Sequence, residues 1–354
     1  MAINPFKSKK QDKFTALDFS HNRINLVHCG VDKGEIALHV WQKQRIPAGV
    51  INEGIVNNNS ILKVAVNNLL QEASYKPGKL IISPAPGQEF IHRMEISDAA
   101  EQDIKEIVLN KLEYHLSLSS DDLYCDHLIL KKEKDLWQVL LLAIPNGVLD
   151  GYKKIFENSP FSPQVANFQS LALVSLLKHQ DNLAEVSLIV NMDVVKSRIV
   201  IASENDFFQD RITDLGGDNL SWVFKEEKKG WDEKDKSQMK SALNSEEIKE
   251  GSETEKIAQK LKQEIDKAME EQKNKFSQYP VEKIYLTGGF KLVGLRDYLT
   301  ERIEVDIAVI EPMEGIKLDM YESTKQQRKF YIKDKNLMSG ALGLVASEVL
   351  HDAR

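Results

Sequence analysis

Two polar turns, each set between apolar strands, carry the residues with which this chain could hold a phosphate group. The first lies within residues 14–27 and contains Asp18, and the second lies within residues 186–200 and contains Asn191 and Asp193. A triphosphate site needs acids that position a magnesium ion and its waters, and glycines that let backbone N–H groups approach the phosphate oxygens. Only some of these groups are present, so we expect the scaffold of such a site to be kept and its catalysis to be lost.

The two hairpins indicate an internally duplicated chain. Each reads as an apolar strand, a polar turn and a second apolar strand, and each opens one half of the sequence. In the first half a third strand over 36–42, a helix over 61–73 and a buried strand over 79–83 follow, and this order predicts a parallel strand pair. The expected fold class is therefore α/β, with two lobes that grip a ligand between them.

A block with a different element order interrupts the first half. It reads as a strand, a helix, two strands and a helix, over residues 90–96, 98–115, 123–131, 136–145 and 146–157. In its first helix the apolar residues recur at helical spacing. This β-α-β-β-α order predicts a small subdomain inserted into the first lobe.

These elements divide the chain into five parts. We expect a flexible N-terminal tail (1–12), a first lobe (13–90 and 161–184), the inserted subdomain (91–160), a second lobe (185–224 and 281–354) and a charged helical subdomain (225–280). In the last of these, Ile257, Leu261 and Ile265 recur every four residues, which predicts an amphipathic helix.

Composition favours an acidic protein of a reducing, aqueous compartment. The 354 residues carry a net charge of −7, which disfavours nucleic-acid binding because that function needs a basic face. Two cysteines, Cys29 and Cys125, cannot form a disulfide framework. No apolar run approaches the roughly 20 residues that cross a bilayer, the basic N-terminus lacks the apolar core of a signal peptide, and the histidines show no metal-ligand spacing. We expect a cytosolic protein without a metal site.

Several short motifs follow one another in a definite order along the chain. They are the two hairpins, Ile46-Pro47-Ala48-Gly49, Pro84-Ala85-Pro86-Gly87, Leu215-Gly216-Gly217-Asp218, Leu286-Thr287-Gly288-Gly289 and Gly340-Ala341-Leu342-Gly343-Leu344. Their order and spacing resemble those of the PilM family of type IV pilus assembly proteins and, more distantly, of FtsA of bacterial cell division. The resemblance covers nearly the whole length of the chain.

The resemblance implies a duplicated actin-like (ribonuclease H-like) fold with the inserted subdomain of the PilM and FtsA branch. It also implies a cytoplasmic adaptor, peripheral to the inner membrane, that binds the N-terminal tail of a PilN-like inner-membrane protein between the first lobe and the inserted subdomain. Pilus motor or platform proteins and a second copy of the chain are further candidate partners. Arg93 matches a basic position of the family motif, and the other candidate groove residues follow from the expected geometry or belong to the subdomain core: Phe90, Ile91, Met94, Ile107, Lys111 and Leu112.

Comparison with the family's phosphate turns shows how far this site has changed. The family's first turn reads Asp-Ile-Gly, then small residues and often a lysine, whereas this chain keeps Asp18 but has Ser20 at the glycine position, His21 among the small residues and Asn25 at the lysine position. In the second turn an asparagine replaces the acid and an aspartate replaces the glycine. A β-carbon crowds the backbone approach, and a carboxylate there repels phosphates.

The candidate nucleotide residues are six positions in the two turns and two glycine pairs that the family places near the nucleoside. The glycine pairs could equally serve only as tight turns. The full set is Asp18, Ser20, His21, Asn25, Asn191, Asp193, Gly216, Gly217, Gly288 and Gly289. We expect weak or no nucleotide binding, no ATP–magnesium cofactor and no productive ATP hydrolysis.

Three other functions compete with the adaptor. An actin-like protein whose bound ATP regulates pilus assembly would need intact phosphate turns. A cell-division protein like FtsA would be expected to end in a linker and an amphipathic membrane helix, whereas this sequence ends directly after a closing helix over 337–350. The cytoplasmic part of a type II secretion protein would continue into a transmembrane span. The machine that an adaptor would serve stays undetermined between pilus, competence and secretion.

Overall fold

The computed structural model describes residues 12–72, 78–97, 99–116, 119–193, 195–216, 248, 251–288, 294–319 and 335–352. Nearly all of the expected N-terminal tail and most of the first part of the charged region lie outside these residues. Among the described residues, none of the helices has the length and apolar character that crossing a membrane requires.

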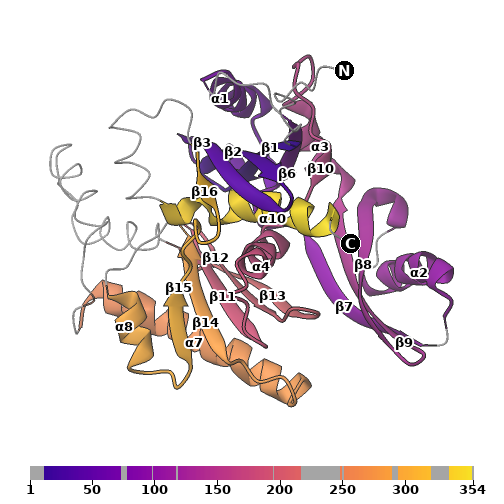
Figure 1. Ribbon diagram of the computed structural model, residues 1–354, viewed down its shortest axis with the longest axis vertical. Helices are drawn as coiled ribbons and strands as arrows, with labels where there is room; N and C mark the ends of the chain where they lie inside the picture. The colour runs from indigo at the N-terminus through magenta and orange to yellow at the C-terminus, as the bar shows by residue number, and fades with distance from the viewer. Residues whose placement is uncertain are drawn as a thin grey trace, which may run out of the picture.

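Two sheets with the same strand order form the body of the molecule (Figure 1). The first lobe is built on the order β10-β6-β1-β2-β3, with β1 Asp12–Phe19, β2 Arg23–Asp32, β3 Glu35–Arg45, β6 Lys79–Ser83 and β10 Val165–Ala166. The second lobe has the order β15-β14-β11-β12-β13, with β11 Ser187–Met192, β12 Ser197–Ala202, β13 Phe207–Thr213, β14 Lys283–Gly288 and β15 Asp306–Val309. In the first sheet β1 pairs antiparallel with β2 and parallel with β6. In the second sheet β11 pairs antiparallel with β12 and parallel with β14. The predicted duplication is confirmed.

The inserted subdomain is a separate three-stranded sheet in the order β7-β9-β8, at the right of Figure 1. It comprises β7 Phe90–Ser97, β8 Leu123–Glu133 and β9 Leu136–Pro145. Helix α2 (Ile104–Leu116) packs on one face of this sheet. This helix begins later than predicted, because Ala100 is extended and residues Glu101–Asp103 first form a single 3-10 turn. A second 3-10 turn, Ser120–Asp122, leads into β8.

The remaining elements of the first lobe cover the face of its sheet that lies away from the second lobe. They are helix α1 (Asn59–Glu72), the small hairpin of β4 (Ile51–Asn52) and β5 (Ile55–Val56), and helix α3 (Asn146–Lys154), which ends the inserted block. Apolar side chains from α1 and α3 share one core with β1 and β2.

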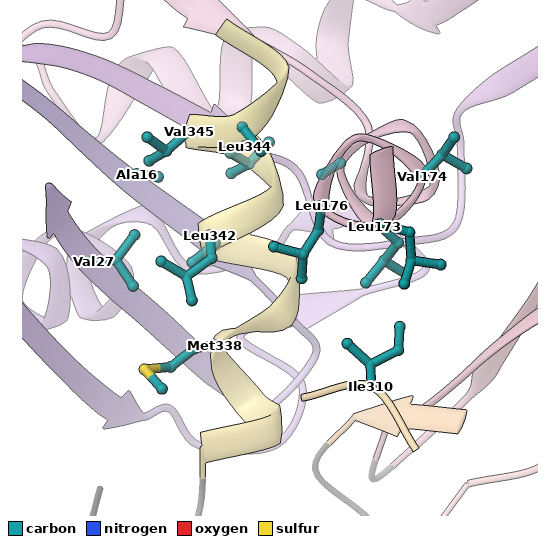
Figure 2. Close-up of a cluster of buried hydrophobic side chains, with 14 of the residues drawn as sticks. Ala16, Val27, Leu173, Val174, Leu176, Ile310, Met338, Leu342, Leu344 and Val345 are labelled. Carbon is teal, nitrogen blue, oxygen red and sulfur yellow. The ribbon is translucent and has the colours of Figure 1, made fainter. Parts of the chain in front are cut away.

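Two apolar helices lie between the lobes. Helix α4 (Gln169–His179) and helix α10 (Ser339–Asp352) pack against each other, and their side chains share one core with both large sheets. Figure 2 shows Leu342 and Val345 of α10 beside Val27 and Ala16 of the first sheet, and Leu176 of α4 pointing toward α10. A helix that is apolar on all sides is typical of such a buried position.

Gly343 allows α4 and α10 to approach this closely. A β-carbon at that position would overlap the backbone carbonyl of Ala172 in α4. The glycine that the sequence placed in the closing helix therefore has a packing role.

Two segments assigned to the second lobe lie against the first. Helix α10 contacts β1, β2 and β6. Strand β16 (Lys317–Leu318), which follows the second lobe, pairs parallel with β3 at the edge of the first sheet. No strand was predicted there, because two residues are too few to show an alternating pattern. The ring Nδ1 of His39 lies 2.8 Å from the backbone oxygen of Asp319, which fixes the end of this short strand.

The second lobe carries its own helices on the face away from α4 and α10. Helix α7 (Glu253–Lys275) buries the side chains of Ile257, Leu261 and Ile265 against β11 and β12. The amphipathic helix predicted in the charged region is confirmed. Helix α8 (Leu295–Thr300) packs beside β15, and a 3-10 turn, Lys335–Met338, precedes α10.

Candidate functional site

The two hairpin turns meet at the junction between the lobes, around a very small cavity. Its volume is about 10 Å³, near the minimum that can hold a single water molecule. Six of the predicted nucleotide residues line it: Asp18, Ser20, Asn25, Asn191, Asp193 and Gly288. The structure therefore brings the two predicted turns together around a small cavity.

The other predicted residues do not reach this cavity or lie outside the described residues. His21 is buried, and burial lowers the pKa of its ring. Gly216 is buried at the end of the described segment 195–216, while Gly217 and Gly289 lie outside the described residues. Gly288 has a φ of +107°, and a β-carbon there would overlap the backbone oxygen of Met192, so the backbone alone requires a glycine at this position.

Asp18 is the buried acid at the centre of the site. Its carboxylate accepts a hydrogen bond from Gln169 Nε2 at 3.1 Å and lies against Gly340 of α10, where a β-carbon would overlap it. Burial raises the pKa of Asp18 to about 7, although the hydrogen bond from Gln169 opposes this shift. A carboxyl group with a pKa this high must first lose a proton before it can offer magnesium a full negative charge.

Side chains from the two lobes bridge the cavity directly. Gln169 at the start of α4 accepts a hydrogen bond from Asn191 Nδ2 at 2.8 Å, so its amide joins Asp18 of β1 to Asn191 of β11. Arg23, at the end of the first turn, donates to Asp193 Oδ1 in the second turn at 2.9 Å. Both members of this ion pair are mostly buried, with side-chain exposures of 12% and 18%.

Sequence reasoning missed Gln169, and it did not include Arg23 among the candidate nucleotide residues. The only local signal for Gln169 is an amide at the start of an otherwise apolar helix. Nothing in the sequence near either residue indicates its partner, because the partners lie in other elements.

Three further charged groups join the second lobe to the rest of the molecule. Lys196 donates to Glu53 at 2.7 Å, and Arg93 of the inserted subdomain donates to Asp206 at 2.8 Å. Arg198, with 2% exposure, pairs both with Glu89 and with Asp210 of its own lobe. The junction between the lobes therefore contains several charged contacts in addition to its apolar core.

A larger cavity of about 400 Å³ lies where the inserted subdomain, α4, the end of α10 and the turn before β13 come together. We call it the groove. Its apolar wall includes Leu128 and Leu130 of β8, Leu140 and Leu142 of β9, Leu171 and Val174 of α4, and Phe207 of β13. Charged residues of both signs stand around this wall, including Lys79, Lys178, Glu204, Asp206 and Glu348. Such a space, apolar with polar groups at its rim, has the character of a ligand site.

Comparison with known proteins assigns the chain to a family. Residues 16–346 match the family model described as type IV pilus assembly protein PilM. The chain belongs to the PilM family. It is similar to the solved PilM–PilN type IV pilus biogenesis complex, with a TM-score of 0.77, 18% sequence identity, and coverage of 95% of this chain and 98% of that one.

A second solved structure with this fold is the ethanolamine utilization protein EutJ from Carboxydothermus hydrogenoformans. Its TM-score is 0.51 at 11% identity, and the match covers 97% of this chain and 92% of that one. Among curated proteins there is no match. The duplicated actin-like fold with an inserted subdomain is thus confirmed for this PilM-family chain.

In this PilM-family structure the seven residues predicted for the tail groove do not line the cavity named the groove above. Phe90, Met94, Ile107 and Leu112 pack in the core between the subdomain sheet and α2, on the opposite face from the groove. Ile91 packs against the core between the lobes, Arg93 pairs with Asp206, and Lys111 donates to the backbone oxygen of Glu95. The sequence signal for the wall of this cavity is the alternation along β8 that places Asp126, Leu128 and Leu130 on one face.

Proposed function

We propose that this PilM-family protein is a cytoplasmic adaptor that binds the N-terminal tail of a PilN-like inner-membrane protein in the groove. The observation that carries the proposal is the apolar wall between the inserted subdomain and α4, at the place where the family resemblance locates the tail. The fold is shared with a solved PilM–PilN complex, which supports a partner of this kind. The protein would then link a membrane-spanning pilus complex, or a related secretion machine, to the cytoplasm.

The groove suits an extended peptide with aliphatic side chains. Strands β8 and β10, both of which contribute to the groove, stand at the outer edges of their sheets among the described residues. Edge strands can offer backbone hydrogen bonds to an added strand, while the apolar wall receives alternate side chains of the peptide. Affinity would come from the backbone, and specificity would come from Leu128, Leu142 and their neighbours.

The Leu128→Asp variant is expected to weaken binding of a synthetic PilN-type tail at least tenfold. Leu128 is on the groove wall and 38% exposed, so the substitution places a charge against the peptide at little cost to the fold. Titration of a fluorescent peptide, followed by anisotropy, measures the dissociation constant.

The control for this experiment is Val64→Asp, because Val64 is an exposed aliphatic residue on α1, outside the groove. It should bind the tail as wild type does. The proposed function would be rejected if wild type showed no binding at high micromolar peptide. The proposed location of the site would be rejected if the two variants had equal affinities.

We further propose that the protein binds ATP weakly or not at all and acts without hydrolysing it. The support is the site itself: the cavity has room for about one water, the Arg23–Asp193 pair joins the two turns between which phosphates would lie, and the Asn191 amide is engaged by Gln169. The residues present therefore do not fit a magnesium triphosphate unless the lobes separate and these contacts break.

Millimolar magnesium-ATP is expected to leave the thermal unfolding midpoint unchanged within about 1 °C. A nucleotide present at 100 times its dissociation constant would stabilise the folded state by about 2.7 kcal/mol, which corresponds to a rise of several degrees. Differential scanning fluorimetry makes this comparison, with magnesium chloride at matched ionic strength as the control. A saturable rise of several degrees that Asp18→Ala abolished would contradict the proposal.

A further inference from the structure

The residues that depart from the family's phosphate turns are complementary to one another. Asn191 replaces an acid, and its amide nitrogen donates to Gln169 Oε1, which an unprotonated carboxylate could not do. Asp193 replaces a glycine, and its carboxylate pairs with Arg23 from the opposite turn.

The side chain of Arg23 is not needed to form its own turn. That turn is closed by the backbone, since Ser20 N–H donates to the Arg23 carbonyl at 2.8 Å. The guanidinium is therefore free to reach Asp193, which is 170 residues away in the sequence. An ion pair with both partners mostly buried is screened less by solvent and salt than one on the surface.

We infer that Arg23, Asp193, Gln169 and Asn191 form an internal clamp that holds the two lobes closed without a nucleotide. A phosphate ligand held between the two turns, as the sequence pattern suggests for such a site, would contact both of them and so tie the lobes together. Here the side chains make that connection themselves. The closed arrangement is thereby a permanent property of the chain and not a response to ATP.

The clamp has a consequence for the groove, and this step rests on the proposed function. The groove wall combines Leu128 and Leu142 of the inserted subdomain and Val174 of α4 with Phe207 of the second lobe. Asp206, beside Phe207, is held by Arg93 of the subdomain. Because one wall residue belongs to the second lobe, separating the lobes would dismantle the groove. Clamp and tail binding are therefore coupled, and the coupling acts in both directions.

The first test measures lobe closure directly and needs no peptide. Spin labels are attached through V64C on the first lobe and V309C on the second, two exposed positions, in a Cys125→Ser background. The remaining cysteine, Cys29, is fully buried, and burial raises the pKa of its thiol, so it should not react. Pulsed electron resonance then reports the distance distribution between the lobes.

The expected result is one narrow distribution for the parent protein, unchanged by magnesium-ATP. Arg23→Asp and the milder Asp193→Asn should lengthen and broaden it, and the double exchange of Arg23→Asp with Asp193→Arg should restore it at least in part. Arg302→Asp, which breaks an exposed ion pair with Glu301 inside the second lobe, is the matched control and should have no effect. Unchanged distributions in both single variants, or no recovery in the exchange, would overturn the clamp.

The second test measures the affinity for the tail in the same variants. Arg23→Asp is expected to weaken binding about tenfold, the charge exchange to recover it, and added tail to narrow the distance distribution of Arg23→Asp. If the distances between the labels change in the clamp variants as expected while the affinity for the tail stays constant, the proposed coupling between clamp and groove is wrong. If the parent protein does not bind the tail although the distances between the labels change as expected, the clamp is supported and the proposed partner is rejected.

Discussion

Replacing Arg198 with methionine is expected to lower the free energy of unfolding by about 3–5 kcal/mol, the usual cost of removing one partner from a buried ion pair. The Arg198 side chain is 2% exposed, and those of its partners Glu89 and Asp210 are 7% and 8% exposed. Without the guanidinium, two carboxylates would stay buried with no positive charge between them. Urea unfolding at pH 7.5, followed by circular dichroism, measures the loss.

Two further variants separate the charge effect from a packing effect. Adding Glu89→Gln and Asp210→Asn to Arg198→Met should recover much of the lost stability, because the unpaired charges are then gone. Arg302→Met is the matched control, since Arg302 pairs with Glu301 on the surface, and it should change stability by no more than about 0.5 kcal/mol. Equal losses for Arg198→Met and Arg302→Met would show that the buried network does not tie Glu89 to the second lobe.

The Asp18→Asn variant is expected to be more stable than wild type above pH 7 and nearly equal to it near pH 4. Burial raises the pKa of Asp18 in the folded protein to about 7, the nearby Asp193 adds to the shift, and Arg23 opposes it. Between the usual pKa of 3.8 and this value, the folded state holds a proton that the unfolded state has released. Stability therefore falls as pH rises through this window.

The loss that Asp18 causes amounts to at most about 4 kcal/mol, from about 1.4 kcal/mol for each pH unit. Asparagine cannot ionise, yet its side-chain oxygen can still accept the hydrogen bond from Gln169. Unfolding free energies of wild type and Asp18→Asn, measured from pH 4 to pH 8.5, should diverge up to about pH 7 and differ by a constant amount above it.

The exposed Asp32 supplies the control, because Asp32→Asn should shift the whole profile by a constant. Parallel profiles for wild type and Asp18→Asn would show that Asp18 is ionised throughout. They would also remove one argument against magnesium binding, because an ionised carboxylate is the ligand that this metal prefers.

The sequence alone determined the features that depend on neighbouring residues. The two hairpins, the strand–helix–strand order and the inserted block follow from alternating and helical apolar patterns, which are local. The changes at Ser20, Asn191 and Asp193 were also readable, since the chemistry that a phosphate turn requires is a property of a few consecutive residues.

Only the tertiary structure decided which partners those residues have. The pairing of Arg23 with Asp193 joins the two halves of the chain, and Gln169 reaches both lobes from a helix that neither hairpin contains. The sequence led to other residues of the inserted sheet for a similar reason: alternation identifies two faces, but only the packing shows that α2 covers one of them and that Leu128 and Leu142 face α4. Long-range pairing and the choice of face depend on how complete elements pack, and that information is not present in any short stretch of residues.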